Sequence, residues 1–305
     1  MHVFVTGPTG FIGSAVLPEL LSRGHTVLAL ARTAVAAQKL QEQQGVEVHR
    51  GSLDDLDSLK AGAAKADGVI HLAFKHDFSN FLGSAQLDEQ VTTALANSLA
   101  GTNKPLVIAS ATGPLMSDPT RDPSVPATED HLYPSSLHKA PRIASEQVIR
   151  SFASQGVRGS IVRLPPSVHG PGDPQFVPGI ISAARRNGVS PYVGEGANIW
   201  PGVHVLDAAR VFRLALEKGI PGSVFHALGD NDTIAFKDMA TIIGEKLSVP
   251  VKSISPEDAQ AHFGFLAMFA KLHSNISADT TKEVLRWKSE QVTLREDLEN
   301  GSYFV

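Results

Sequence analysis

Three glycines near the start of the chain are spaced so that the backbone between them could bind a phosphate. Gly7, Gly10 and Gly13 follow an apolar, β-branched run over residues 2–6 and precede apolar residues at helical spacing. A residue without a Cβ lets the chain turn out of a strand, lets amide groups approach a phosphate, and lets a helix pack closely on the strand. The first amides of a helix also carry partial positive charge. Strand, turn and helix in this order favour a dinucleotide site over an ordinary surface turn. The residues expected to contact the dinucleotide are Gly7, Thr9, Gly10, Phe11, Ile12 and Gly13.

The end of the second predicted strand, residues 26–31, favours a phosphorylated dinucleotide. NAD sites place a carboxylate there to bind the ribose hydroxyls, whereas an arginine suits a 2′-phosphate. This chain has Ala31 followed by Arg32 and Thr33, and a guanidinium can bind a phosphate through two parallel hydrogen bonds. We therefore expect NADP(H) as the cofactor in preference to NAD(H). The alternative is that Arg32 only faces solvent at the start of a loop.

An alternation of strand and helix patterns surrounds this turn and would position it. Such alternation is typical of a doubly wound parallel α/β sheet, the Rossmann fold, whose ligands bind at the carboxyl ends of the strands. We expect the dinucleotide-binding domain to cover residues 1–165, with its sheet completed by segments near 203–206 and 224–227. Further strands are predicted at residues 46–49, 68–73, 105–110 and 159–164, and helices at 53–66, 82–100 and 140–154.

From residue 166 onward the chain is rich in glycine and proline and then in short strand and helix patterns. We expect a smaller substrate-binding region over residues 166–305, built on the first domain rather than hinged from it. An apolar helix is predicted over residues 256–272, and it contains an aromatic run at 262–269. That run is either packed core or an apolar wall over the nicotinamide, and the second alternative implies an apolar or aromatic substrate.

The composition excludes several other kinds of site. Zero cysteines in 305 residues remove disulfides, thiolate zinc sites and cysteine nucleophiles, and the histidines lack metal-ligand spacing, so we expect no metal. A net charge of −4 with scattered basic residues gives no sign of a nucleic-acid or membrane partner. No apolar run approaches the roughly 20 residues that span a bilayer. The first predicted strand starts at residue 2, which leaves no room for a signal peptide, so we expect a cytoplasmic protein.

The glycine turn and four later motifs resemble the extended short-chain dehydrogenase/reductase superfamily, in its epimerase/dehydratase-like branch. The turn reads VTGPTGFIG at residues 5–13, and the later motifs are VIHLA at 69–73, VRLPPSVHGPGD at 162–173, HVLD at 204–207 and GSL at 51–53.

The resemblance implies that Leu72, Ala73 and Pro165 line the cofactor. Lys75, two residues beyond Ala73, is a further candidate cation in the same cleft. Ser52 and Leu53 occupy a position near adenine where relatives carry an acid before the leucine, so that polar contact is weakened or lost here. The helices over residues 82–100 and 140–154 are the pair that relatives often use for a homodimer.

The family's catalytic motif, Tyr-x-x-x-Lys, is absent from this chain. The family lysine is usually followed four residues later by a glutamate, which Arg142 and Glu146 match, and this register puts His138 in the tyrosine position. His138 could then move a proton, and Arg142 could act as a fixed cation beside the ribose or a phosphate. A second register would use Ser135 and Lys139 instead. A third alternative makes His138 a loop histidine and Arg142–Glu146 an ordinary surface pair.

Ser110 and Thr112 follow the fifth predicted strand, where the family has a hydroxyl that orients the substrate oxygen. Either residue could instead cap a turn. Together these features predict an NADP(H)-dependent oxidoreductase that transfers hydride between the nicotinamide and a carbonyl or alcohol of a small molecule. The alternatives are a regulator that binds NADP(H) without turnover, and an epimerase or lyase with a tightly held cofactor.

Overall fold

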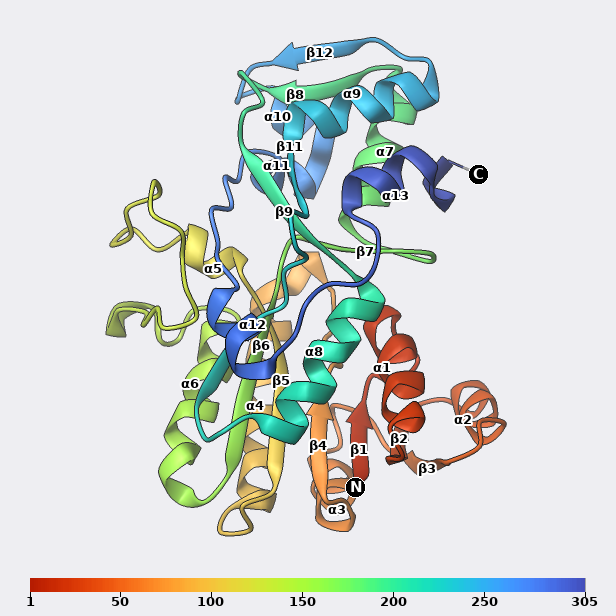
Figure 1. Cartoon of the computed structure of the whole chain (residues 1–305), viewed down its shortest axis with the longest axis vertical. Helices are drawn as coiled ribbons and strands as arrows, with labels where there is room; N and C mark the ends of the chain where they lie inside the picture. Colours follow the sequence, from red (N-terminus) through yellow and green to blue (C-terminus); the bar gives the residue numbers. More distant parts are fainter. Residues whose placement is uncertain (305) are drawn as a thin grey trace.

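The computed structural model describes residues 1–304; residue 305, the last residue of the predicted substrate-binding region, lies outside them. A seven-stranded sheet fills its lower part, and all the paired strands in it run parallel (Figure 1). The predicted α/β fold with a doubly wound parallel sheet is thereby confirmed. In spatial order the strands are β10 (Ser223–His226), β6 (Arg158–Leu164), β5 (Pro105–Ala111), β4 (Gly68–His71), β1 (His2–Thr6), β2 (Thr26–Ala31) and β3 (Val46–Arg50).

Helices cover both faces of this sheet, because nearly every strand is apolar on both sides and must be buried on both. One face carries α1 (Phe11–Ser22), α2 (Ala34–Gln41) and α8 (Val205–Lys218). The other face carries α3 (Leu56–Lys65), α4 (Phe81–Leu99) and α6 (Ile143–Phe152). The short helix α5 (Gly113–Met116) follows β5 directly.

The prediction that a segment near residues 203–206 completes the sheet is wrong. Strand β9 (Ile199–His204) belongs to a separate three-stranded sheet, where it lies between β7 (Ser167–His169) and β11 (Thr233–Ala235). The chain then turns into α8, because the His204 ring caps that helix by accepting a hydrogen bond from the Leu206 amide at 3.3 Å. The other predicted segment, near 224–227, does complete the sheet, as β10 beside β6.

The upper part of the molecule has its own core, formed around Trp200, Phe236 and Phe263. It contains a two-stranded sheet of β8 (Ser190–Val193) and β12 (Val251–Ile254), and the helices α7 (Phe176–Asn187), α9 (Phe236–Leu247) and α13 (Leu294–Asn300).

The single helix predicted over residues 256–272 is instead two short helices, α10 (Ala259–Phe263) and α11 (Ala267–Ala270), joined by a 3-10 turn. Gly264 has φ +58° and ψ −132°, a conformation that glycine adopts readily and residues with a Cβ do not, and α10 ends there. The aromatic run is therefore divided: Phe263 is buried in the upper core, whereas Phe265 and Met268 are exposed.

The last part of the chain ties the two parts together. Helix α12 (Asp279–Leu285) packs against α8 and β10, and α13 then lies in the upper part. Asp207, Asp230 and Asp232 accept hydrogen bonds from the backbone amides of residues 290–291, 289 and 294, respectively. Three carboxylates thus hold the segment that connects α12 to α13. Within the described residues, no helix has both the length and the hydrophobicity to cross a bilayer.

Candidate active site

The turn after β1 can hold a diphosphate only because of its glycines. Gly7 has φ +69°, and a Cβ there would lie 2.9 Å from the backbone nitrogen of Ala73. A Cβ on Gly13 would overlap the carbonyl group of Gly7. Gly10 begins α1 without a side-chain cap, and its amide donates to the Gly7 carbonyl at 3.1 Å. The turn therefore brings backbone against backbone, as the predicted glycine roles require.

The open face of this turn suits an anion. Thr9 and Gly10 are exposed, and Phe11 and Ile12 are half-buried at the start of α1. The first amides of a helix have no acceptor within the helix, and the first turn of α1 contains no acidic residue. The residues present therefore fit the diphosphate of a dinucleotide.

The end of β2 leads into a cationic turn. Arg32 and Thr33 are exposed, and the Thr33 hydroxyl caps α2 by accepting a hydrogen bond from the Ala36 amide at 3.2 Å. Ser52 and Leu53 lie half-buried beyond the end of β3. Neither the turn after β2 nor the first turn of α2 carries an acid in place of the one missing at Ala31.

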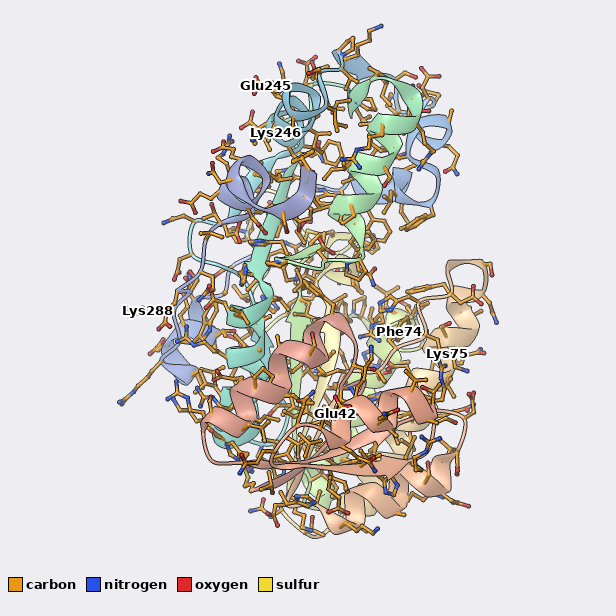
Figure 2. The ribbon with its side chains drawn as sticks, turned by 90° about the vertical axis from the view of Figure 1, so that its right-hand side faces the viewer. Glu42, Phe74, Lys75, Glu245, Lys246 and Lys288 are labelled. Atoms are coloured by element: carbon orange, nitrogen blue, oxygen red, sulfur yellow. The ribbon has the colours of Figure 1, made fainter. Side chains whose placement is uncertain are left out.

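The loop after β4 forms another wall of the proposed cofactor site. Leu72 and Ala73 are half-buried, and the Ala73 amide donates to the Thr6 hydroxyl at 3.2 Å. The Lys75 ammonium forms an ion pair with the two carboxylate oxygens of Asp54, at 2.7 and 3.0 Å. Figure 2 shows Lys75 and its neighbour Phe74 at the end of the lower part that faces the upper part. The Lys75 charge is therefore already paired with a carboxylate from the loop after β3.

Arg142 lies in a buried polar network rather than on the protein surface. Its guanidinium donates to Asp88 at 3.1 Å and to the carbonyl of Ala109 at 2.5 Å, and it lies 4.4 Å from the centre of the Phe74 ring. Ser145 also donates to Asp88, at 2.6 Å. Burial alone would raise the pKa of the Asp88 carboxyl, but Arg142 and the other donors hold it below its ordinary value. The alternative of an exposed Arg142–Glu146 pair is excluded.

Helix α6 starts later than the predicted residue 140. A residue that precedes proline is driven out of the helical conformation, which affects Ala140 before Pro141. Arg142 then has φ +68°, a strained left-handed conformation for a residue with a side chain. The helix begins at Ile143, so His138 and Arg142 do not lie one turn apart on one helix.

Ser110, Glu146 and Arg163 form a second buried network at the carboxyl ends of β5 and β6. Glu146 accepts two hydrogen bonds from the Arg163 guanidinium, at 2.6 and 2.9 Å, and a third from the Ser110 hydroxyl at 2.7 Å. His226 accepts from Arg163 at 3.3 Å, and burial lowers the pKa of its ring to about 3. Both charged side chains are fully buried.

Thr112 is likewise fully buried, and its hydroxyl donates to the Leu164 carbonyl at 3.2 Å. Pro165 follows that carbonyl and is also buried. The hydroxyls of Ser110 and Thr112 thus both have protein acceptors, and their predicted role toward substrate stays a prediction.

His138 is half-buried at the end of a 3-10 turn over residues 135–137. Its Nε2 lies 3.0 Å from the Tyr133 carbonyl oxygen. Because a carbonyl oxygen can only accept, Nε2 carries the hydrogen, and the neutral ring keeps its lone pair on Nδ1. In the second register, Ser135 is exposed, and the exposed Lys139 forms an ion pair with Glu89 at 2.6 Å.

Sequence reasoning missed Arg50, the last residue of β3. Its guanidinium donates to the carbonyls of Thr33 at 2.7 Å and Arg32 at 3.4 Å. The available signal was its place at a strand end, directly before Gly51.

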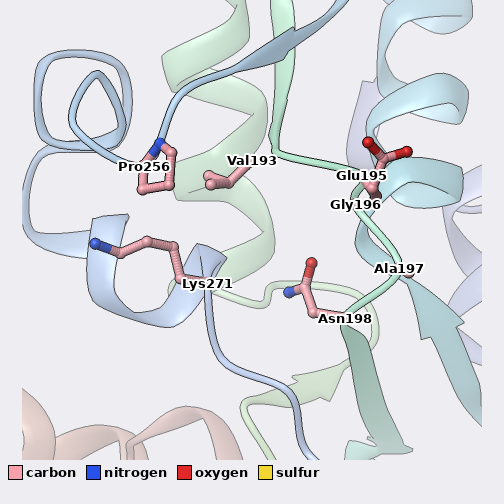
Figure 3. A pocket seen from close by; sticks show the side chains of 7 residues that line it. All are labelled: Val193, Glu195, Gly196, Ala197, Asn198, Pro256 and Lys271. Atoms are coloured by element: carbon pink, nitrogen blue, oxygen red, sulfur yellow. The ribbon is translucent and has the colours of Figure 1, made fainter.

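A separate cavity of about 300 Å³ lies in the upper part, between the loop after β8 and the segment near α11 (Figure 3). Asn198 on its wall donates to the carbonyls of Ala270 and Leu272. No residue predicted for the cofactor or for catalysis lines it. The full lining is Val193, Glu195, Gly196, Ala197, Asn198, Pro256 and Lys271.

Residues 3–227 match the NAD dependent epimerase/dehydratase family. The chain belongs to this family. The match runs from β1 through β10 and so includes the glycine turn and both buried networks. The predicted membership of the extended short-chain dehydrogenase/reductases is confirmed.

Curated relatives and solved structures agree with this assignment. The chain is 46% identical over 299 residues to the uncharacterized protein YLL056C of Saccharomyces cerevisiae, with 98% of each chain covered. It is 30% identical over 232 residues to a 2-alkyl-3-oxoalkanoate reductase of Stenotrophomonas maltophilia, covering 73% of this chain and 67% of the reductase. The structure of the dTDP-glucose 4,6-dehydratase DesIV from Streptomyces venezuelae, with NAD bound, superposes with a TM-score of 0.76 at 21% identity, covering 99% and 95% of the two chains. Members of this family thus act with a nicotinamide dinucleotide.

Proposed function

We propose that this protein is an NADP(H)-dependent reductase or dehydrogenase that acts on a carbonyl or alcohol carbon of a small apolar or aromatic molecule. The observation that carries the proposal is the cationic turn after β2, next to a glycine turn with no room for a Cβ at Gly7 or Gly13. The 30% identity to a reductase of oxoalkanoates supports the reaction class.

The residues that would hold the dinucleotide come from three turns at one edge of the sheet. The amides from Phe11 to Gly13, at the start of α1, would bind the diphosphate, Arg32 and Thr33 the 2′-phosphate, and the backbone at Leu72 and Ala73 would line the adenosine side. When bound, the cofactor supplies the hydride acceptor or donor, and the protein supplies position and charge.

Arg142 would act as a fixed cation in this site. An arginine side chain carries a fixed charge, so it does not exchange a proton in the way that the family's lysine can. Asp88 and the Ala109 carbonyl hold it against the ring of Phe74. Its expected contribution is the electrostatic effect of its positive charge beside the nicotinamide ribose or a phosphate of the dinucleotide.

His138 would move the proton. With Nε2 donating to the Tyr133 carbonyl, Nδ1 is the atom that takes a proton from an alcohol or, once protonated, gives one to a carbonyl oxygen. Nδ1 makes no hydrogen bond with the part of the chain that the structure describes.

The test is a panel of aliphatic and aromatic ketones, assayed by NADPH oxidation with the purified protein. We expect turnover that falls by about 100-fold or more in His138→Ala, while the Kd of NADPH is unchanged. Lys139→Ala is the matched control for the second register and should keep its turnover. Loss of activity in Lys139→Ala alone would contradict the assignment of His138.

The same site geometry favours one second candidate, a protein that binds NADP(H) without turnover. Ser110 and Thr112, the two hydroxyls expected to orient a substrate, both donate to acceptors within the protein. Tight NADPH binding together with no oxidation of NADPH by any carbonyl compound would support this candidate over the reductase.

A further inference from the structure

Arg50 lies beside the turn that follows β2, on the same face of the sheet as α2. It pairs with Ala31 in the parallel register of β2 and β3. Successive side chains of a strand point to opposite faces, and the preceding residue, His49, packs edge-on against Phe4 in the core on the α3 side. Arg50 therefore points toward the side of α1 and α2.

The Arg50 guanidinium holds the shape of that turn. It donates to two successive carbonyls, those of Arg32 and Thr33, while the Thr33 hydroxyl caps α2. Two of its five donor hydrogens are used in this way, and three remain. Because the side chain is exposed, those donors are open to a ligand at the turn.

Two arginines flank this turn, and no carboxylate pairs with either one. Among the described residues, neither Arg32 nor Arg50 forms an ion pair, and neither has a further interaction with the rest of the chain. Of the two exposed acids in the following loop, Asp54 is paired with Lys75, and Asp55 caps α3 by accepting a hydrogen bond from the Ser58 amide. Two guanidinium groups beside one turn repel each other, and a bound dianion would relieve that repulsion.

We propose that Arg50 is a specificity-determining residue that completes, with Arg32, a two-arginine subsite for the 2′-phosphate of the adenosine ribose. Arg32 would bind the phosphate from the turn itself, and Arg50 would bind it from β3 while fixing the carbonyls of the same turn. This inference rests on the proposed NADP(H) preference and extends it to a residue outside the β2–α2 turn.

The experiment uses the full chain and two small probes, adenosine 2′,5′-bisphosphate and adenosine 5′-monophosphate, which differ by the 2′-phosphate alone. Affinities are measured by calorimetry at low and high salt. Arg50→Met should weaken binding of the bisphosphate by about tenfold, the usual effect of losing a charge-assisted hydrogen bond. Binding of the monophosphate should change by less than about twofold, and the difference should shrink at high salt.

Two control variants distinguish an effect of the Arg50 charge on binding from an effect of Arg50 on the shape of the turn. Arg50→Lys keeps the charge but loses the paired contact with the two carbonyls, and it should recover part of the bisphosphate affinity. Arg185→Met removes an exposed charge from α7, and it should leave both affinities unchanged. An equal loss for both probes in Arg50→Met means that Arg50 only shapes the turn, and the inference is overturned.

The failure of this inference differs from the failure of the proposed function. If Arg32→Met selectively weakens the bisphosphate and Arg50→Met does not, the NADP(H) preference stands and the role of Arg50 is overturned. If the wild-type protein binds both probes equally and Arg32→Met changes neither, the NADP(H) preference itself is wrong, and the role of Arg50 is overturned with it.

Discussion

The two ends of the sheet's carboxyl edge are built in opposite ways. Around β1, β2 and β3, apart from the buried Thr6, the polar groups are backbone amides and exposed side chains such as Arg32 and Arg50. Around β5, β6 and β10 the polar groups are Ser110, Arg163 and His226, all buried and bonded to one another or to Glu146. The polar groups named at the first end are open to a ligand. The side chains named at the second end have their hydrogen-bond partners within the protein. The difference teaches that a polar residue at the functional edge of this fold can serve stability alone.

The largest expected effect is at the closed end. Arg163→Met leaves the Glu146 carboxylate fully buried without its ion pair, which should lower the free energy of unfolding by about 3–5 kcal/mol. The double variant Glu146→Gln/Arg163→Met should regain part of that loss. Urea unfolding measures both. A small change in stability together with a selective loss of dinucleotide binding would contradict the view that the polar groups around β5, β6 and β10 serve stability.

At the open end, Gly10→Val should reduce NADPH affinity by about 100-fold or more, because the side chain would occupy the place of the diphosphate. The fold should tolerate it better than a change at Gly7 or Gly13, since a Cβ at Gly10 lies at an ordinary 3.4 Å from the Gly7 carbonyl oxygen. Calorimetry gives the affinity and urea unfolding gives the stability. Unchanged affinity would remove the dinucleotide assignment.

His169, which lies away from both ends of the sheet, tests whether a buried charge stabilises the fold wherever it lies in the molecule. His169 is buried in the upper part between Asp232 and Asp297, each at 2.9 Å. Burial alone would lower the pKa of its ring, but the two carboxylates raise it to about 9. Because this pKa lies above the unfolded value near ~6.5, the stabilisation is fully present below that pH and is lost as pH rises through about 9.

The corresponding measurement is urea unfolding as a function of pH. The wild type should lose on the order of 2–3 kcal/mol between about pH 6.5 and pH 9.5 relative to His169→Gln, whose curve should be flatter over that range. Parallel curves for the two proteins would show that the His169 charge does not stabilise the fold.

The smallest effect is expected at the ion pair between Lys75 and Asp54, which lies at the open end and is largely exposed. Lys75→Met should change the free energy of unfolding by less than about 1 kcal/mol. If the pair closes the outer side of the adenosine site, the dissociation rate of NADPH should rise by a few-fold. Stopped-flow displacement of NADPH measures that rate, and Lys139→Met, which breaks another exposed pair, is the control.

Sequence reasoning succeeded where local chemistry dictates local structure. The signals for the glycine turn, namely the glycine spacing, the apolar strand and the residue after β2, all lie within about thirty residues of one another. The structure has the predicted order of strand, turn and helix there. Sequence reasoning failed where the hydrogen-bond or ion-pair partner of a side chain is far away in the sequence. Nothing near Arg142 indicates that Asp88 binds it, and nothing near Glu146 indicates Arg163. The start of α6 was misplaced for a local reason, since Ala140 precedes a proline and Arg142 then adopts a left-handed conformation.

The three aspartates that hold residues 289–294 have a consequence for how the protein is made. Asp207, Asp230 and Asp232 receive their backbone donors from a segment synthesised roughly sixty to eighty residues later. On the ribosome these carboxylates lack their backbone donors until translation passes residue 294 and the segment leaves the exit tunnel. The lower sheet can assemble during synthesis, whereas α13 can dock only after its own residues, 294–300, have left the exit tunnel.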